Sequence, residues 1–280
     1  SGTGARQGMR RLAFALGTLL LCGQAHALES QRLPDGMVST GSNEIAEAWL
    51  TRPTTRYAHG IMGDAIEAGG LMVKMASGRL HEHVLPAGFV FEDRRARLVD
   101  LDGDARDEVV VVLTSVTEGA ALAVYDVTNG KLRLRSKTPH IGRTHRWLNP
   151  AEFADLDGDG RIEITAVWTP HLGRVLQAWR LVDGELQQVA RIKGYSNHAI
   201  GSRVLDMTEI VKLSDGRTAL AGPSVGYDEI AFVVLQQGSF TEVARVPAAG
   251  RITSAVRISK NGRQLEFATG RKSLVTIDIP

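Results

Sequence analysis

Residues 155–163 (DLDGDGRIE) have a near copy at residues 100–108 (DLDGDARDE). Each stretch places aspartates at alternate positions and a glutamate at the ninth position. Carboxylate oxygens on a tight loop are the ligands that calcium prefers in proteins. Carboxylates held this close together repel one another strongly unless a cation offsets their charge. The two stretches therefore predict two calcium-binding loops.

The residues on either side of these loops predict strands. Short apolar segments precede the loops at residues 97–99 and 153–154, and runs rich in Val and Ile follow them at residues 109–113 and 164–168. β-Branched runs of this length are typical of strands. An EF-hand would need a helix on each side of its calcium loop. We therefore expect each loop to connect two β-strands.

A glycine turn between two strand-like runs recurs along the chain. The four turns are Ser77-Gly78, Asn129-Gly130, Asp183-Gly184 and Gln237-Gly238, separated by 52, 54 and 54 residues. Each is typical of a β-hairpin in which glycine supplies a positive φ. A period near fifty residues with four short strands per unit indicates a β-propeller.

The blade count follows from this period. The acidic loops lie between the first and second strands of their units, and residues 214–217 and 261–262 make the same connection without the acid cluster. The fifth unit contains only three strands. We therefore predict an all-β, five-bladed β-propeller in which residues 36–40 or 45–50 supply the last strand and close the ring.

The first 27 residues predict a leader. A basic start at residues 9–11, an apolar run to Cys22 and small residues at 25–27 are typical of a signal peptide, leaving residues 28–280 as a single domain. Without the leader, 30 Lys and Arg face 31 Asp and Glu, so nothing favours nucleic acid. The mature chain has no cysteine and no apolar run that predicts a transmembrane segment. We expect a periplasmic or secreted monomer.

Residues 153–164 (FADLDGDGRIEI) resemble the FG-GAP or VCBS repeat of bacterial secreted proteins and of integrin α-subunit propellers. The resemblance implies calcium bound by side chains of Asp155, Asp157, Asp159 and Glu163 with the Arg161 carbonyl, and by Asp100, Asp102, Asp104 and Glu108 with the Arg106 carbonyl. Ala105 stands where the second loop has Gly160. If that position needs a left-handed backbone, alanine costs about 1 kcal/mol, so we expect weaker binding in the first loop.

Polar and aromatic residues gather in the connections predicted on the face opposite the acidic loops. We expect them to form a ligand-binding rim comprising Tyr57, His59, His145, Trp147, Asn149, His171, Asn197 and His198. The competing interpretation is that these side chains cap strand ends and fill gaps between blades. A zinc site formed by His59, His145 and His198 is a further alternative.

No nucleophile elbow, metalloprotease motif, P-loop or dinucleotide fingerprint is present, so no catalytic residue is predicted. The favoured function is a calcium-stabilised binding module for a protein or glycan partner on the rim. The alternative is a glycan hydrolase or lyase that uses rim carboxylates, which would need two acids about 5–10 Å apart.

Overall fold

The computed structural model describes residues 31–280, in which twenty strands and no helix are found. The prediction of an all-β chain is confirmed. The predicted signal peptide, residues 1–27, lies outside the described residues. Within residues 31–280, no helix is long and apolar enough to cross a membrane.

The first two repeat units share one nine-stranded sheet. The first unit comprises β1 (Ser39–Thr40), β2 (Ile45–Thr54), β3 (Glu67–Met75) and β4 (Leu80–Val84), and the second comprises β6 (Arg97–Val99), β7 (Glu108–Ser115), β8 (Gly119–Thr128) and β9 (Lys131–Lys137). Between them, β5 (Phe89–Phe91) pairs with both β3 and β7 and joins the two units.

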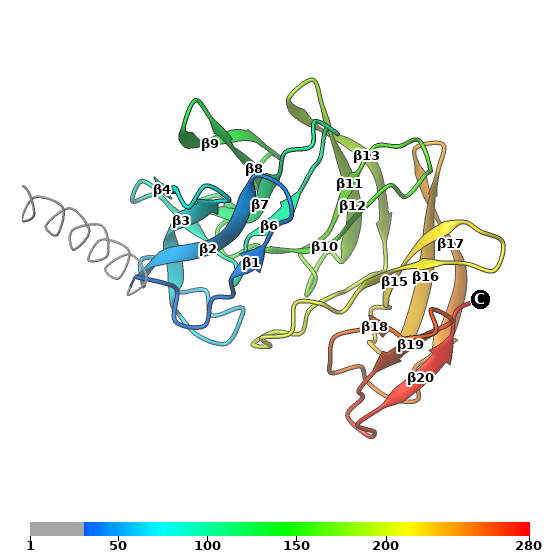
Figure 1. Cartoon of the computed structure of the whole chain (residues 1–280). Coiled ribbons are helices and arrows are strands. Elements are labelled where there is room, and N and C mark those ends of the chain that lie inside the picture. Colours follow the sequence, from blue (N-terminus) through cyan, green and yellow to red (C-terminus); the bar gives the residue numbers. More distant parts are fainter. Residues whose placement is uncertain (1–30) are drawn as a thin grey trace, which may run out of the picture.

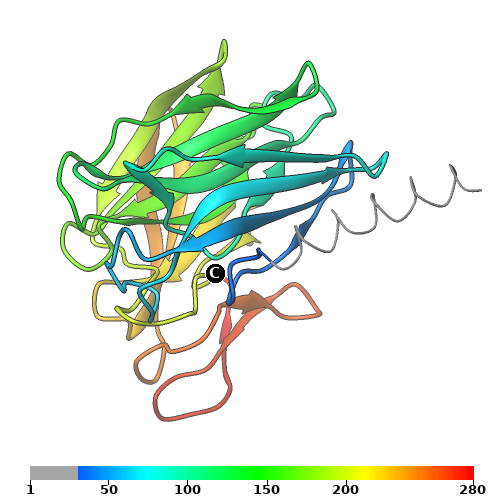
Figure 2. The same cartoon turned by 90° about the vertical axis from the view of Figure 1, so that its left-hand side faces the viewer.

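The remaining three units are separate antiparallel sheets. The third comprises β10 (Leu148–Ala154), β11 (Glu163–Trp168), β12 (Val175–Val182) and β13 (Glu185–Lys193). The fourth comprises β14 (Glu209–Lys212), β15 (Thr218–Pro223), β16 (Glu229–Gln236) and β17 (Ser239–Pro247), and the fifth comprises β18 (Arg257–Ile258), β19 (Gln264–Phe267) and β20 (Val275–Asp278). The units follow one another along an arc in Figure 1, and Figure 2 gives the perpendicular view.

The four predicted hairpin turns are confirmed. Gly78, Gly130, Gly184 and Gly238 all have positive φ, between 69° and 82°. In the last three hairpins the residue before glycine also has φ near 50°, and the loop has two residues. This is the turn geometry whose twist matches that of the flanking strands.

The predicted closing strand lies elsewhere in the fold. Residues 45–50 belong to β2, which pairs with β3 from Ile45 to Thr54, and β1 pairs with the opposite edge of β2. Within the described residues, β20 pairs only with β19. The N-terminal segment therefore completes the first unit, because β3 offers a longer partner than the four-residue β20.

Four hydrophobic clusters join consecutive units. Central strands contribute to two clusters at once, because successive side chains of a strand point to opposite faces. Val109 and Val111 of β7 pack toward the first unit, whereas Val110 and Val112 pack toward the third. Strands buried on both faces need apolar residues at every position, which explains the continuous Val and Ile runs after the acidic loops.

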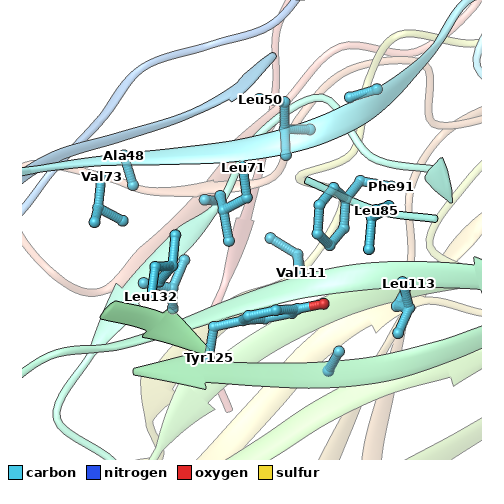
Figure 3. Packing of buried hydrophobic residues seen from close by; sticks show 14 of the residues in the cluster. Ala48, Leu50, Leu71, Val73, Leu85, Phe91, Val111, Leu113, Tyr125 and Leu132 are labelled. Carbon is cyan, nitrogen blue, oxygen red and sulfur yellow. The ribbon is translucent and has the colours of Figure 1, made fainter. Parts of the chain in front are cut away.

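The cluster between the first two units contains β2. Figure 3 shows its side chains reaching from both units, namely Ala48, Leu50, Leu71 and Val73 from β2 and β3, and Val111, Leu113 and Tyr125 from β7 and β8. Leu50 is only 1% exposed. The N-terminal strand is thus a component of the core.

Replacing Leu50 with alanine should lower the free energy of unfolding by about 2–5 kcal/mol, because it leaves a cavity in this cluster. The matched control is Leu274→Ala, since Leu274 is 61% exposed. That change should stay within about 0.5 kcal/mol of wild type. Urea denaturation measures both. A Leu50→Ala protein as stable as the control would show that β2 does not pack as described.

Candidate functional site

The two acidic loops lie where the sequence predicted them. Residues 100–107 connect β6 to β7, and residues 155–162 connect β10 to β11. The ninth-position acids, Glu108 and Glu163, are the first residues of β7 and β11 and are buried. Each loop therefore begins at the surface and ends with a carboxylate inside the protein.

The first aspartate folds each loop around its own carboxylate. Asp155 accepts hydrogen bonds from the backbone N–H groups of Gly158 (2.7 Å), Asp159 (3.1 Å) and Gly160 (2.9 Å). Asp100 accepts the equivalent three bonds, including one from Ala105 at 2.9 Å. Ala105 has φ 65° where Gly160 has φ 85°. The position does require a left-handed backbone, so the first loop carries the strain expected for alanine.

Three of the four predicted carboxylate ligands converge in each loop. Ligand atoms of Asp100, Asp102 and Glu108 lie within 4.8 Å of one another, as do those of Asp155, Asp157 and Glu163. Asp104 and Asp159 stand outside these groups, and each accepts the backbone N–H two residues further on. Clustered carboxylate oxygens fit a hard divalent cation. The carbonyls of Arg106 and Arg161 stay predicted ligands.

Sequence reasoning missed an arginine at each loop. Arg180 of β12 donates to Glu163 through Nε (2.7 Å), to Asp159 through Nη1 (3.0 Å) and to Asp157 through Nη2 (3.2 Å). Arg135 of β9 donates to Glu108 and Asp102, both at 2.6 Å. The spacing of the acids could not identify either partner, because each arginine lies on a later strand of the unit than the strand that follows the loop. The available signal was Arg180 itself, the one charged residue of β12.

Burial changes the acidity of the ninth-position glutamates. Burial raises the pKa of Glu108 to about 7, against the lowering effects of the Leu101 backbone N–H and of Arg135. Burial also raises the pKa of Glu163, opposed by the Leu156 backbone N–H and by Arg180. A cation beside either carboxylate therefore stabilises a charge that the buried position disfavours.

The predicted rim lies at the other ends of the same strands. Residues 155–162 precede β11 and residues 169–174 follow it, so roughly 20 Å of strand separates the acidic loop from this connection. A cavity of about 210 Å³ opens among the connections on this side. Its walls are His59, Ile61, His145, Arg146, Trp147, Thr169, His171, Leu172 and Ile200. Four of the eight predicted ligand-binding residues therefore line one cavity.

Trp147 is part of the core as well as a wall of this cavity. Its side chain is 2% exposed and packs in the cluster between the second and third units. Its indole N–H donates to the backbone carbonyl of Glu92 at 2.9 Å. The ring thus fills the gap between units, as the competing interpretation expected, while its role as a ligand-binding residue of the rim stays a prediction.

The other four predicted residues are buried structural elements. The side-chain amide of Asn149 donates to the carbonyls of Asn197 (3.2 Å) and Leu205 (2.9 Å), and that of Asn197 donates back to Asn149 (3.2 Å). Tyr57 is 3% exposed and accepts the His145 backbone N–H at 2.7 Å. His198 is fully buried. These contacts match the competing interpretation, that loop side chains fill gaps and satisfy strand ends.

The three histidines of the zinc alternative do not form a metal-binding group in the described part of the chain. The only groups of three candidate ligands there are the two acidic ones. His59 lies between β2 and β3 of one unit, not between units as expected, and its Nδ1 contacts the buried carboxylate of Glu92. Its ring centroid is 5.1 Å from that of His145. His198 instead contacts His171.

Half-buried His171 pairs with buried His198, with His171 Nε2 3.1 Å from His198 Nδ1. Burial lowers the pKa of each ring to about 4. The positive charges of His59 and Arg174 lower the pKa of His171 further, and His171 does the same for His198. Both rings are therefore neutral in the folded protein at pH 7. In the unfolded chain their pKa is near 6.5.

Acid should weaken the fold through this pair. Between pH 6.5 and about 4 the unfolded chain binds protons that the folded rings do not, so stability falls as pH falls. The loss between pH 7 and pH 5 should be about 2 kcal/mol for the buried ring of His198, with a smaller addition from half-buried His171. Urea midpoints at these two pH values measure it. His171→Asn should show a smaller loss than wild type, and the exposed-site control His145→Asn should match wild type. Equal pH dependence in all three proteins would contradict this assignment.

Residues 100–166 match the family model of the FG-GAP-like repeat, and both acidic loops lie within the match. No curated protein matches the chain.

Proposed function

We propose that this chain, which carries an FG-GAP-like repeat at residues 100–166, is an extracytoplasmic, calcium-binding β-propeller that acts as a binding module. Five repeat units of three or four antiparallel strands support the propeller architecture. The signal-peptide pattern of residues 1–27 supports export, and the cysteine-free mature sequence suits a domain stabilised by packing and metal. Its partner is a protein or a glycan.

The rim cavity is the observation that carries the binding role. Exposed His145 and half-buried His59 and His171 offer ring nitrogens there, beside the apolar surfaces of Ile61 and Leu172. Leu172 is 65% exposed and Ile200 is 71% exposed. Polar groups in a hollow, bordered by exposed aliphatic side chains, are what a recognition site for another molecule requires.

The acidic loops supply stability in this proposal. Calcium held by their carboxylates would fix the connection into a central strand and offset the repulsion among the acids. The loops lie at the strand ends away from the rim cavity, so the metal would support the scaffold without touching the ligand.

The enzyme alternative has weaker support. Ala68 pairs with Phe91, and extending this antiparallel register by one residue sets Glu67 opposite Glu92. Both are nearly inaccessible, at 2% and 0% exposure. Burial and the nearby Glu92 raise the pKa of Glu67 to about 10. A carboxyl pair closed off from solvent offers no place for a glycosidic bond, which favours the binding role.

Chelation tests the calcium role. EDTA should lower the melting temperature and excess calcium should restore it, because a ligand of the folded state alone stabilises by RT ln(1 + [L]/Kd), about 2.7 kcal/mol at a hundredfold excess over Kd. Differential scanning calorimetry measures the shift, with magnesium as the control cation. Identical melting in EDTA and in calcium would contradict a stabilising metal.

Rim variants test the binding role. His145→Ala removes an exposed imidazole from the cavity wall, so it should weaken retention of a partner about tenfold while leaving the melting temperature near wild type. The probes are arrays of cell-wall glycans and of envelope proteins, and Leu274→Ala is the surface control. Trp147→Ala is unsuitable, because losing this buried ring should cost about 3–5 kcal/mol of stability. A partner that binds His145→Ala as tightly as wild type would place the site elsewhere.

A further inference from the structure

The two acidic loops differ in how completely the protein itself satisfies their carboxylates. In the second loop every carboxylate oxygen accepts a hydrogen bond. Backbone N–H groups donate hydrogen bonds to both carboxylate oxygens of Asp155, and to one carboxylate oxygen each of Asp157, Asp159 and Glu163. Arg180 donates hydrogen bonds to the other carboxylate oxygen of Asp157, Asp159 and Glu163. No oxygen of the loop's acids is left without a partner.

Arg180 is built into this position. It has 8% of its surface exposed, and in the β11–β12 ladder it lies directly opposite Glu163. Its guanidinium contacts three carboxylates at once, and Arg161 adds a second positive charge on Asp159 at 3.1 Å. A planar guanidinium with several donors matches a carboxylate cluster better than an ammonium group does. A delocalised cation thus already stands among the three acids.

The first loop has one more carboxylate than the second, and fewer of its carboxylate oxygens accept a hydrogen bond. Asp102 Oδ1 and Asp104 Oδ2 have no hydrogen-bond partner in the described structure, and Arg135 contacts only two of the acids. The eighth position adds Asp107, where the second loop has Ile162. Arg106, the counterpart of Arg161, turns toward Glu44 at 3.6 Å instead of toward its own loop. Of the five carboxylates in this loop, only those of Asp102 and Glu108 therefore contact an arginine.

A cavity borders the first loop, and it shares Glu108 with the converging carboxylates of Asp100, Asp102 and Glu108. It has a volume of about 260 Å³, and its charged lining residues are Glu44, Asp104, Arg106, Asp107, Glu108, Asp126 and Arg135. Asp107 is 5% exposed, and its Oδ2 is buried without any hydrogen-bond partner. A buried carboxylate oxygen without a donor is costly unless a cation or water completes it.

We propose that the two loops have divided roles: Arg180 takes the place of a metal ion in the loop of residues 155–163, and the loop of residues 100–108 is the one that binds calcium. This inference rests on the proposed calcium-binding function and specifies its location. It reverses the ranking expected from Ala105, because the backbone strain there is outweighed by the greater charge and the open carboxylate oxygens. Calcium needs six to eight oxygen ligands, and in the second loop it would first have to displace Arg180 from three acids.

Calcium stoichiometry tests the division. Isothermal titration of the folded chain with calcium chloride should give one site per chain. Asp102→Asn should abolish that site, and the matched change Asp157→Asn should leave one site of wild-type affinity. Arg180→Met, which removes the guanidinium and keeps much of the side-chain volume, should create a second site. Arg135→Met should keep one site and tighten it at least tenfold, because it removes the competing charge from the first loop.

Different failures identify different errors. Two sites in wild type, or loss of binding in Asp157→Asn but not in Asp102→Asn, would overturn the division while leaving calcium binding intact. No calcium in any of these proteins would overturn the proposed calcium role itself. If Arg180→Met does not fold, the Asp102→Asn and Asp157→Asn pair still decides the question.

Discussion

Electrostatic repulsion among carboxylates at the start of two central strands is the constraint on which this structure depends. β7 and β11 are buried on both faces, and each begins with a glutamate that ends an acidic loop. Folding brings at least three carboxylates of each loop within 4.8 Å of one another. At such distances like charges repel by several kcal/mol at the dielectric of a protein surface. A cation beside each cluster therefore stabilises the folded chain.

The protein meets this requirement differently in its two loops. In the second loop the positive charge comes from Arg180 of β12, which pairs with β11. The pairing of these two strands therefore also brings the guanidinium to the carboxylates. In the first loop Arg135 neutralises only part of the charge. Asp104 and Asp107, which Arg135 does not contact, line a cavity beside the loop. Under the proposed function calcium would complete the first loop, whereas Arg180 already contacts three acids of the second.

Local patterns in the sequence predicted the local structure well. The positive-φ glycines of the hairpins and the place of both acidic loops follow from residues within a few positions of one another. The pairing of β2 with its chain neighbour β3 was missed because the N-terminal segment was assigned to the fifth unit. The two arginines come from other strands than the acids they contact, and spacing alone does not specify such pairs. Arg180 is 17 residues from Glu163, and Arg135 is 27 residues from Glu108.

The rim shows the same limit. His59, His145, Trp147 and His171 were predicted to converge and do line one cavity. The solvent accessibility of each side chain depends on how neighbouring units pack, and the residue pattern does not predict that packing. Trp147 and His198 look like recognition residues by type, yet both fill the space between sheets. Asn149 likewise joins β10 to the β13–β14 connection, through buried amide hydrogen bonds with Asn197.

The most direct test is a crystal structure of the protein grown in calcium, with anomalous diffraction recorded at a wavelength where calcium scatters strongly. The account predicts one calcium peak, among Asp100, Asp102 and Glu108, and the Arg180 guanidinium in contact with Asp157 and Glu163. A calcium peak in the second loop with Arg180 displaced would contradict it.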